Sequence, residues 1–313
     1  MNLAGYNSGS AQPSLNRNFI YSIRIQVPAR REQDEIVDVL NSLDCRIALL
    51  RETNATLEAI AQVLFKSWFV DFDPVRAKQQ GLAPAGMDEA TAALFPEDFE
   101  ESALGLVPRG WQVGSILDVA SLLSGGTPKT DRAEYWGGGI AWASAKDVSQ
   151  STESALIRTE RTITPQGLRE SATRLIPALA TVVVARGATT GRMVFLGEAM
   201  AMNQTCYALA SRRTAPTALY CLIRQIMAGL VNAAHGSVFD TITTSTFAQS
   251  RVGQPPDQLL ARFEELAGPL FHRIVSGTNA AQTLATLRDT LLPRLISGQL
   301  RLPEVNLLAE VTA

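Results

Sequence analysis

The chain has 313 residues, of which 46% are hydrophobic and 19% are charged, and its formal net charge is −2. This composition excludes a disordered chain, and three cysteines without C-x-x-C spacing exclude a disulfide-stapled or cysteine-metal scaffold. We expect the thiols to be buried and reduced. The longest apolar run, 176–185, is too short to cross a bilayer, and the first residues do not resemble a signal peptide. We therefore expect a cytoplasmic protein that does not bind a membrane.

Charge is distributed unevenly along the chain. The segment 105–255 holds 14 Lys or Arg and 9 Asp or Glu, a net charge of +5, so the remainder carries −7. A basic middle between acidic flanks is typical of a polyanion-binding module on a scaffold that does not itself bind. Chance variation in surface charge produces a similar pattern, so the asymmetry needs independent support.

An internal repeat with a constant offset of 227 residues frames the chain. Pro28 aligns with Pro255 and Ile36 with Phe263, and the match continues without a gap for more than thirty further residues. Each copy contains a polar turn, a short strand-like run (19–27 in the first copy), a proline and a long helix.

The helical part of each copy carries apolar residues at alternating spacings of four and three, over 32–70 and 257–297. Such a heptad pattern predicts a long helix that packs against another long helix. Because the segment between them can return the chain, we expect the two helices to pair antiparallel, with Asn54 fixing their register. The residues expected to pair the helices are Ile36, Leu43, Ile47, Leu50, Asn54, Leu57, Leu64, Phe263, Leu270, Ile274, Leu284 and Leu291.

The segment between the helices divides into two parts. Residues 73–104 contain three prolines and are expected to form an irregular connector. Residues 105–255 are predicted to fold as a mixed α/β domain. Its expected strands cover 140–142, 180–185, 192–196 and 205–209, and its expected helix covers 216–234. The predicted fold class is therefore α+β, with one globular mixed α/β domain and two long helices paired as an antiparallel coiled coil.

Sequence motifs for catalysis are absent. There is no H-E-x-x-H, G-x-S-x-G or G-x-x-x-x-G-K-[ST] pattern. His235 and His272 lie at an expected helix end and within a heptad helix, where capping and a polar flank are the ordinary explanations. We predict no catalytic and no metal-binding residue.

Three glycine-rich turns of the basic domain, at 124–130, 142–147 and 186–192, carry basic and hydroxyl side chains. Glycine lets a backbone approach a phosphate, and Lys, Arg, Ser and Thr donate to phosphates or base edges. Any one turn could be an ordinary surface loop, but three in one basic domain favour DNA binding. The candidate DNA-binding residues are Thr127, Lys129, Thr130, Ser144, Lys146, Arg186, Thr189 and Arg192.

Several of these segments resemble the specificity (S) subunits of Type I restriction–modification systems. The run from Pro28 to Arg76 is similar to their central conserved region, and 287–298 to their C-terminal conserved region. Shorter runs that resemble their target-recognition domain are 105–111, 124–128, 135–142 and 202–207. In that family each recognition domain reads one half of a split DNA site. The paired helices set the gap between the halves and dock the modification subunits.

The resemblance implies a domain organisation with one recognition domain, a half-length form of the family pattern. Its parts would be a tail of an incomplete first recognition domain (1–27), a central conserved helix (28–72), a connector (73–104), a target-recognition domain (105–255), a C-terminal conserved helix (256–300) and a tail (301–313).

The resemblance also implies the partners of the chain. They are double-stranded DNA, the modification (methyltransferase) subunits and, where the system has one, a restriction subunit. A homodimer through the long helices would restore two recognition domains. The chain itself would be non-catalytic and would bind no cofactor, with S-adenosylmethionine, ATP and Mg²⁺ on partner subunits.

Two questions stay open at this level. The aromatic residues Phe65, Trp68, Phe69 and Phe72 could fill a core or form a docking site for the modification subunit. The chain could also be a coiled-coil scaffold or regulator that pairs with a full-length specificity subunit and reads no DNA.

Overall fold

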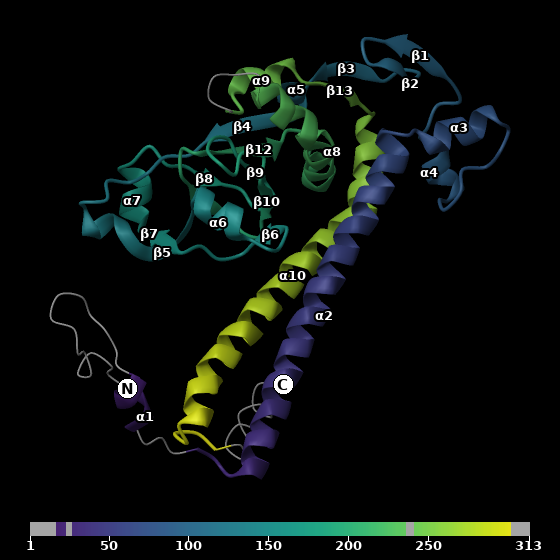
Figure 1. Cartoon of the computed structure of the whole chain (residues 1–313). Helices are drawn as coiled ribbons and strands as arrows, with labels where there is room; N and C mark the ends of the chain where they lie inside the picture. Colours follow the sequence, from purple (N-terminus) through teal and green to yellow (C-terminus); the bar gives the residue numbers. More distant parts are fainter. Residues whose placement is uncertain (1–16, 23–26, 236–240, 302–313) are drawn as a thin grey trace. The chain divides into compact units, whose positions relative to one another are not determined.

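The computed structural model describes residues 17–22, 27–235 and 241–301. The chain divides into two compact units. One comprises Met1–Ala48 and Ala281–Ala313, and the other comprises Leu49–Ala280. Two long helices, α2 (Arg30–Phe69) and α10 (Asp257–Ile296), contribute to both units (Figure 1).

The repeat in the sequence is present in the structure. Helices α2 and α10 each contain 40 residues, and both their first and their last residues differ by 227. The short helices α1 (Arg17–Ser22) and α9 (Thr244–Gln249) show the same offset. The strand expected over 19–27 is therefore wrong at its start, because residues 19–22 belong to α1. A short apolar run does not distinguish strand from helix. Residues 23–26 lie outside the described part of the chain.

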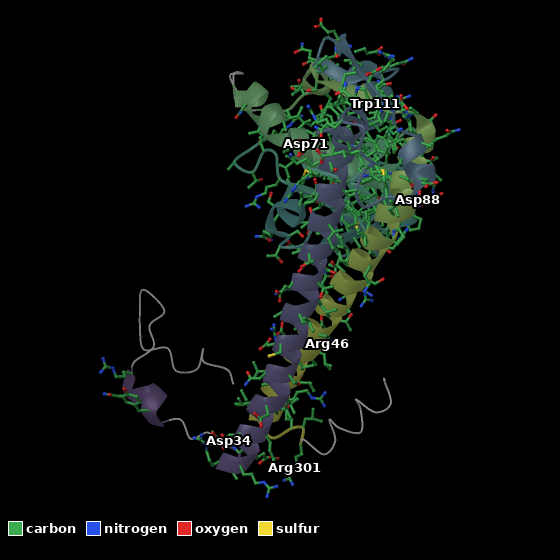
Figure 2. All side chains as sticks on the ribbon, turned by 90° about the vertical axis from the view of Figure 1, so that its right-hand side faces the viewer. Asp34, Arg46, Asp71, Asp88, Trp111 and Arg301 are labelled. Carbon is green, nitrogen blue, oxygen red and sulfur yellow. The ribbon has the colours of Figure 1, made fainter. Side chains whose placement is uncertain are left out.

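In the first unit, the beginning of α2 packs along the end of α10. Ile36 is buried in a cluster with Leu291 and Leu295, and Arg288 Nη1 donates to Asp44 Oδ1 across 2.6 Å. Residues later in α2 contact residues earlier in α10, so the two helices run antiparallel. Figure 2 shows Asp34 and Arg46 on this part of α2, where both side chains are exposed.

In the second unit, the end of α2 packs along the beginning of α10, again antiparallel. Asn54 Nδ2 donates to Thr278 Oγ1 at 3.1 Å, and the rings of Phe65 and Phe263 lie 5.8 Å apart, edge to face. Helix α2 ends at Phe69, and Phe72, three residues later, adopts a left-handed backbone conformation (φ 56°). The stripe of apolar residues at spacings of three and four thus forms the predicted antiparallel coiled coil.

The globular part of the second unit is built on two sheets. The five-stranded sheet has the order β4-β12-β9-β10-β6, and the four-stranded sheet has the order β7-β5-β11-β8. The strands of the first sheet are β4 (Ala120–Ser124), β6 (Ala155–Leu156), β9 (Thr181–Val184), β10 (Met193–Leu196) and β12 (Cys206–Ser211). Those of the second are β5 (Trp136–Ala143), β7 (Arg161–Ile163), β8 (Leu175–Ile176) and β11 (Met200–Met202).

Helices and a strand pair complete this domain. The longest, α8 (Pro216–His235), packs on the sheet through Tyr220, whose ring lies 5.3 Å from that of Phe195 in β10 (Figure 1). The others are α5 (Ile116–Val119), α6 (Ala145–Gln150), α7 (Pro165–Arg169), the 3-10 helix η2 (Ala133–Tyr135) and α9. Strand β3 (Gln112–Ser115) pairs with β13 (Arg251–Gln254). All four expected strands and the expected helix are confirmed.

The connector is more ordered than we expected. Residues 73–104 contain α3 (Asp73–Gln79), α4 (Glu89–Ala93) and β1 (Phe99–Ser102), which pairs with β2 (Gly105–Pro108). Pro74 occupies the first turn of α3, and Asp88 caps α4 by accepting from Thr91 N at 2.7 Å. Proline and aspartate mark helix starts here rather than loops.

One further expectation needs correction. Cys45 is exposed, because it lies on a face of α2 that its packing partner leaves uncovered, whereas Cys206 and Cys221 are buried thiols. Burial raises the pKa of Cys206 to about 12.

Candidate nucleic-acid interface

The first glycine-rich turn rests on the segment that joins β11 to β12. A Cβ at Gly125 would lie 2.2 Å from Met202 O, so only glycine fits there. The next residue, Gly126, donates from its N–H to Met202 O at 2.9 Å and accepts at its carbonyl from Trp142 Nε1 at 3.0 Å. The turn is therefore held firmly against the four-stranded sheet.

This fixed backbone presents three of the candidate side chains to solvent. Thr127, Lys129 and Thr130 are all exposed. Thr127 Oγ1 donates to Gln204 Oε1 at 2.6 Å, and Lys129 O accepts from Trp136 Nε1 at 3.1 Å. Within the described residues, the Lys129 ammonium has no ion-pair partner, so its charge is available to an anion.

An arginine that the sequence did not single out lies beside this turn. The Arg161 guanidinium stacks 3.4 Å from the centre of the Trp136 ring and 5.9 Å from that of Trp142, and Arg161 is exposed. Cation–π stacking orients the guanidinium while leaving its N–H groups free to donate. The sequence contains the two tryptophans but does not indicate which cation stacks on them, because Arg161 reaches them from the neighbouring strand β7.

The second turn begins α6, and its hydroxyl is already used. Ser144 is half-buried and caps the helix. Its Oγ donates to Asp147 Oδ2 at 2.5 Å and accepts from Asp147 N. Lys146 Nζ donates to Glu160 Oε2 at 2.6 Å, which raises the pKa of Lys146. Of the candidates, these two are therefore already engaged within the domain.

The third turn carries two exposed arginines, Arg186 and Arg192. Their neighbour Thr189 accepts from Ser149 Oγ at 2.6 Å, which ties this turn to α6. At Gly191 (φ 88°), a Cβ would lie 2.4 Å from Val231 Cγ2 of α8, so the turn needs glycine for conformation and for space. This hydrogen bond thus links the third turn to the helix that the second turn begins.

The four aromatic residues at and just after the end of α2 differ in their burial. Phe65 and Trp68 are only 4% and 2% exposed and pack in the core of the second unit. Trp68 lies 5.3 Å from the ring of Phe95, and Phe65 contacts Phe69. Phe65, Phe69 and Phe72 line a cavity, and of these three residues Phe69 and Phe72 are half-buried. Trp68 is thus covered by the connector through Phe95, and docking of the modification subunit at these aromatic residues stays a prediction.

The residues predicted to pair the helices are all buried or half-buried. Ile36, Leu43 and Leu291 belong to one cluster in the first unit, and Phe263 and Ile274 lie in the core of the second. Asn54 is 3% exposed and hydrogen-bonded to Thr278. In the part of the chain that the structure describes, we find no group of His, Cys, Asp and Glu that could hold a metal. The described helices also include none with the length and apolarity to span a bilayer.

Comparison with known proteins identifies the chain. Residues 2–59 and 108–258 match the family model of the Type I restriction modification DNA specificity domain. The chain belongs to this family. The two matched segments together include most of α2 and nearly the whole mixed α/β domain, and they meet α10 only at its first two residues.

Individual relatives agree with this assignment. The Type I restriction enzyme HindI specificity subunit of Haemophilus influenzae is 26% identical over 92% of this chain and 71% of its own length. The MjaIX specificity subunit of Methanocaldococcus jannaschii is 24% identical over 97% of this chain and 66% of its own. The chain thus spans about two thirds of the length of these specificity subunits.

Solved specificity subunits resemble the fold. The Type-I restriction-modification S subunit from M. genitalium has a TM-score of 0.51 and 14% identity, and covers 93% of this chain and 68% of that one. The HsdS subunit from Thermoanaerobacter tengcongensis has a TM-score of 0.41 and 18% identity, and covers 95% of this chain and 66% of that one. The likeness to the M. genitalium structure confirms the expected fold, a mixed α/β domain with paired long helices.

Proposed function

We propose that this chain reads one half of a split DNA site for a Type I restriction–modification complex. The observation that carries the proposal is the cluster of Lys129, Trp136 and Arg161, in which a glycine-rich turn fixed to the sheet meets the strands β5 and β7. It supplies exposed cations next to aromatic rings in a domain with a net charge of +5. Arg186 and Arg192 extend the same chemistry to a second turn.

The chain acts in this proposal without catalysing a reaction. Methyl transfer, with its S-adenosylmethionine, belongs to the modification subunits, and ATP and Mg²⁺ belong to the restriction subunit where one is present. The paired helices serve as the spacer between half-sites and as the platform for the modification subunits. A 40-residue helix is about 60 Å long at 1.5 Å per residue, enough to separate two contacts by more than one turn of DNA.

The second recognition domain comes, in this proposal, from a second copy of the chain. The internal repeat supports this arrangement. Phe65 and Phe69, which lie beneath the connector and α8, correspond to Leu292 and Ile296, which are 39% and 51% exposed. Apolar residues that are covered in one repeat and exposed in the other indicate a surface for another protein.

The test is methylome sequencing of cells that express this chain with a modification subunit. We expect a new methylated motif with two inverted, identical half-sites separated by a fixed gap, as two copies of one recognition domain require. Unchanged methylation, with the chain bound to a full-length specificity subunit, would instead support the scaffold function. A gapped motif with two different halves would contradict the homodimer.

A further inference from the structure

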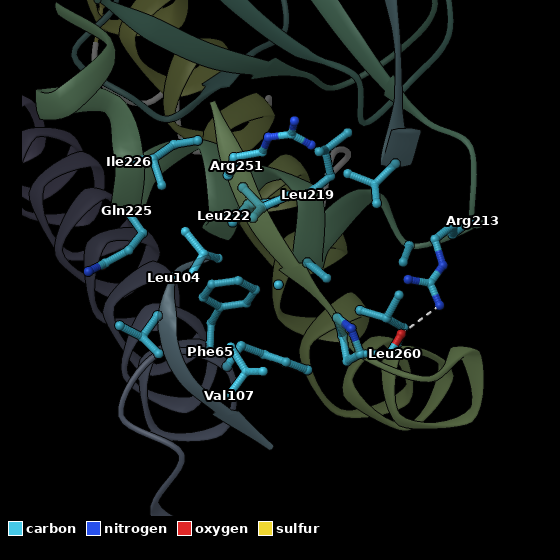
Figure 3. A pocket seen from close by; sticks show the side chains of 18 of the residues that line it. Phe65, Leu104, Val107, Arg213, Leu219, Leu222, Gln225, Ile226, Arg251 and Leu260 are labelled. Atoms are coloured by element: carbon cyan, nitrogen blue, oxygen red, sulfur yellow. Dashed lines mark hydrogen bonds between the residues drawn. The ribbon is translucent and has the colours of Figure 1, made fainter. Parts of the chain in front are cut away.

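An apolar cavity of about 410 Å³ lies in the second unit, where the end of α2, the β1–β2 hairpin, α8 and β13 meet (Figure 3). Its volume falls within the range of about 300–1,000 Å³ that is usual for ligand pockets in proteins. Figure 3 shows Phe65, Leu104 and Leu222 turned toward the same space. The apolar residues of its wall include Phe69, Phe72, Leu106, Leu219, Ile226 and Leu260.

The rim of the cavity exposes apolar side chains that the fold itself does not cover. Leu104 and Leu106, at the turn of the hairpin, are 46% and 60% exposed. The neighbouring strand carries Glu100 and Glu101, both exposed, and these carboxylates disfavour the approach of DNA. An exposed apolar rim around a cavity, with negative charge beside it, is typical of a protein-binding site.

The charged groups that line the cavity are both arginines. Arg213 is already held, because it donates from Nε to Asp257 Oδ1 at 2.6 Å and from Nη2 to Pro255 O at 2.7 Å, the bond drawn in Figure 3. Arg251 is exposed, and its guanidinium has no hydrogen bond or ion pair within the described residues. Among the lining residues there is no Asp or Glu. The complementary occupant is an apolar side chain that lies next to a carboxylate.

We propose that this cavity receives an apolar side chain adjacent to an Asp or Glu on a segment of the modification subunit. The inference rests on the proposed function, which makes that subunit a partner. In the proposed function a second copy of this chain binds at Leu292 and Ile296, which are 39% and 51% exposed in the first unit, and this leaves the cavity for a different protein. Arg251 supplies the charge-assisted hydrogen bond, and the apolar wall supplies the buried area.

The test uses Leu106→Asp and Arg251→Glu in the full-length chain, with Leu82→Asp as the matched control. All three residues are exposed, and Leu82 (59% exposed) does not line the cavity, so each variant is expected to fold. Calorimetric titration with the purified modification subunit should show at least about tenfold weaker binding for the first two variants. The control should stay within about twofold of wild type, with all melting temperatures unchanged.

The outcomes separate the two proposals. Wild-type affinity for the modification subunit in both variants would overturn this inference, while DNA binding measured by fluorescence anisotropy would still test the proposed function. If the wild-type chain did not bind DNA, the proposed function would be contradicted. The affinities of the variants for the modification subunit would still test the cavity proposal. If Leu106→Asp instead dissociated a dimer of the chain in sedimentation, the cavity would hold a second copy, and our assignment would be wrong.

Discussion

Asn54 and Thr278 form a buried hydrogen bond between the two long helices of the second unit. Asn54 Nδ2 donates to Thr278 Oγ1 at 3.1 Å, and the residues are only 3% and 0% exposed. The neighbouring residue Gly277 makes room for the amide, because a Cβ there would lie 2.3 Å from Asn54 Oδ1. A polar pair within an otherwise apolar seam is stable in only one alignment of the helices, so it fixes their register.

We predict that Asn54 and Thr278 are energetically coupled. Asn54→Ala and Thr278→Val should each lower the free energy of unfolding by about 1–3 kcal/mol, because each leaves a buried polar partner without its hydrogen bond. The loss of unfolding free energy in the double variant should be smaller than the sum of the two single losses, by about 0.5–1.5 kcal/mol. Urea unfolding measures all three, and Thr56→Ala, an exposed site on the same helix, should change stability by under about 0.5 kcal/mol. Strict additivity would contradict the coupling.

Tyr220 attaches the recognition domain to α2. Its hydroxyl donates to Glu58 Oε1 at 2.7 Å, and burial raises the pKa of Tyr220 well above its usual value. Tyr220→Phe should lower the free energy of unfolding by about 1.5–3 kcal/mol, the range for a hydrogen bond to a charged group. Tyr207→Phe is the control, since we find no hydrogen bond from that hydroxyl within the described residues. Equal effects of the two substitutions on urea unfolding would argue against the attachment.

The cations of the candidate DNA surface should differ in importance. Arg161→Ala and Lys129→Ala should each weaken binding to a DNA duplex about tenfold and, at phosphate contacts, lower the salt dependence by about one unit. Lys146→Ala should have a smaller effect, because Glu160 already neutralises that ammonium. Fluorescence anisotropy between about 50 and 200 mM salt provides the measurement. The control is Arg31→Ala, at an exposed position on α2. If this control weakened DNA binding as much as Arg161→Ala does, the DNA surface would lie elsewhere.

Glu264 should make stability depend on pH. Burial raises the pKa of its carboxyl group, against the opposing effect of the Ala218 N–H, which donates to Oε1 at 2.7 Å. The folded chain therefore binds this proton more tightly than the unfolded chain, so the contribution of Glu264 to stability falls as pH rises above about 4. Urea unfolding from pH 4 to 7 should show that the free energy of unfolding of Glu264→Gln increases relative to that of wild type as pH rises. A difference that is constant with pH would contradict this.

The sequence predicted the long helices and the domain between them well, because their signals are local. A heptad stripe depends on residues three and four apart, and the repeat with an offset of 227 residues appears again in the matching bounds of α2 and α10. The connector was harder to predict. Pro74 and Asp88 suit a loop as well as a helix start, and only packing against the rest of the unit selects the helix.

The candidate DNA surface shows where sequence information ends. By itself the sequence determined which turns carry glycine, cations and hydroxyls, because these properties belong to single residues and their neighbours. Only the tertiary structure decided that Ser144 and Lys146 are engaged, that Arg161 stacks on Trp136, and that Phe65 is covered while Leu106 is exposed. The physical reason is that each of these outcomes depends on groups that strand pairing and helix packing bring together from distant parts of the chain.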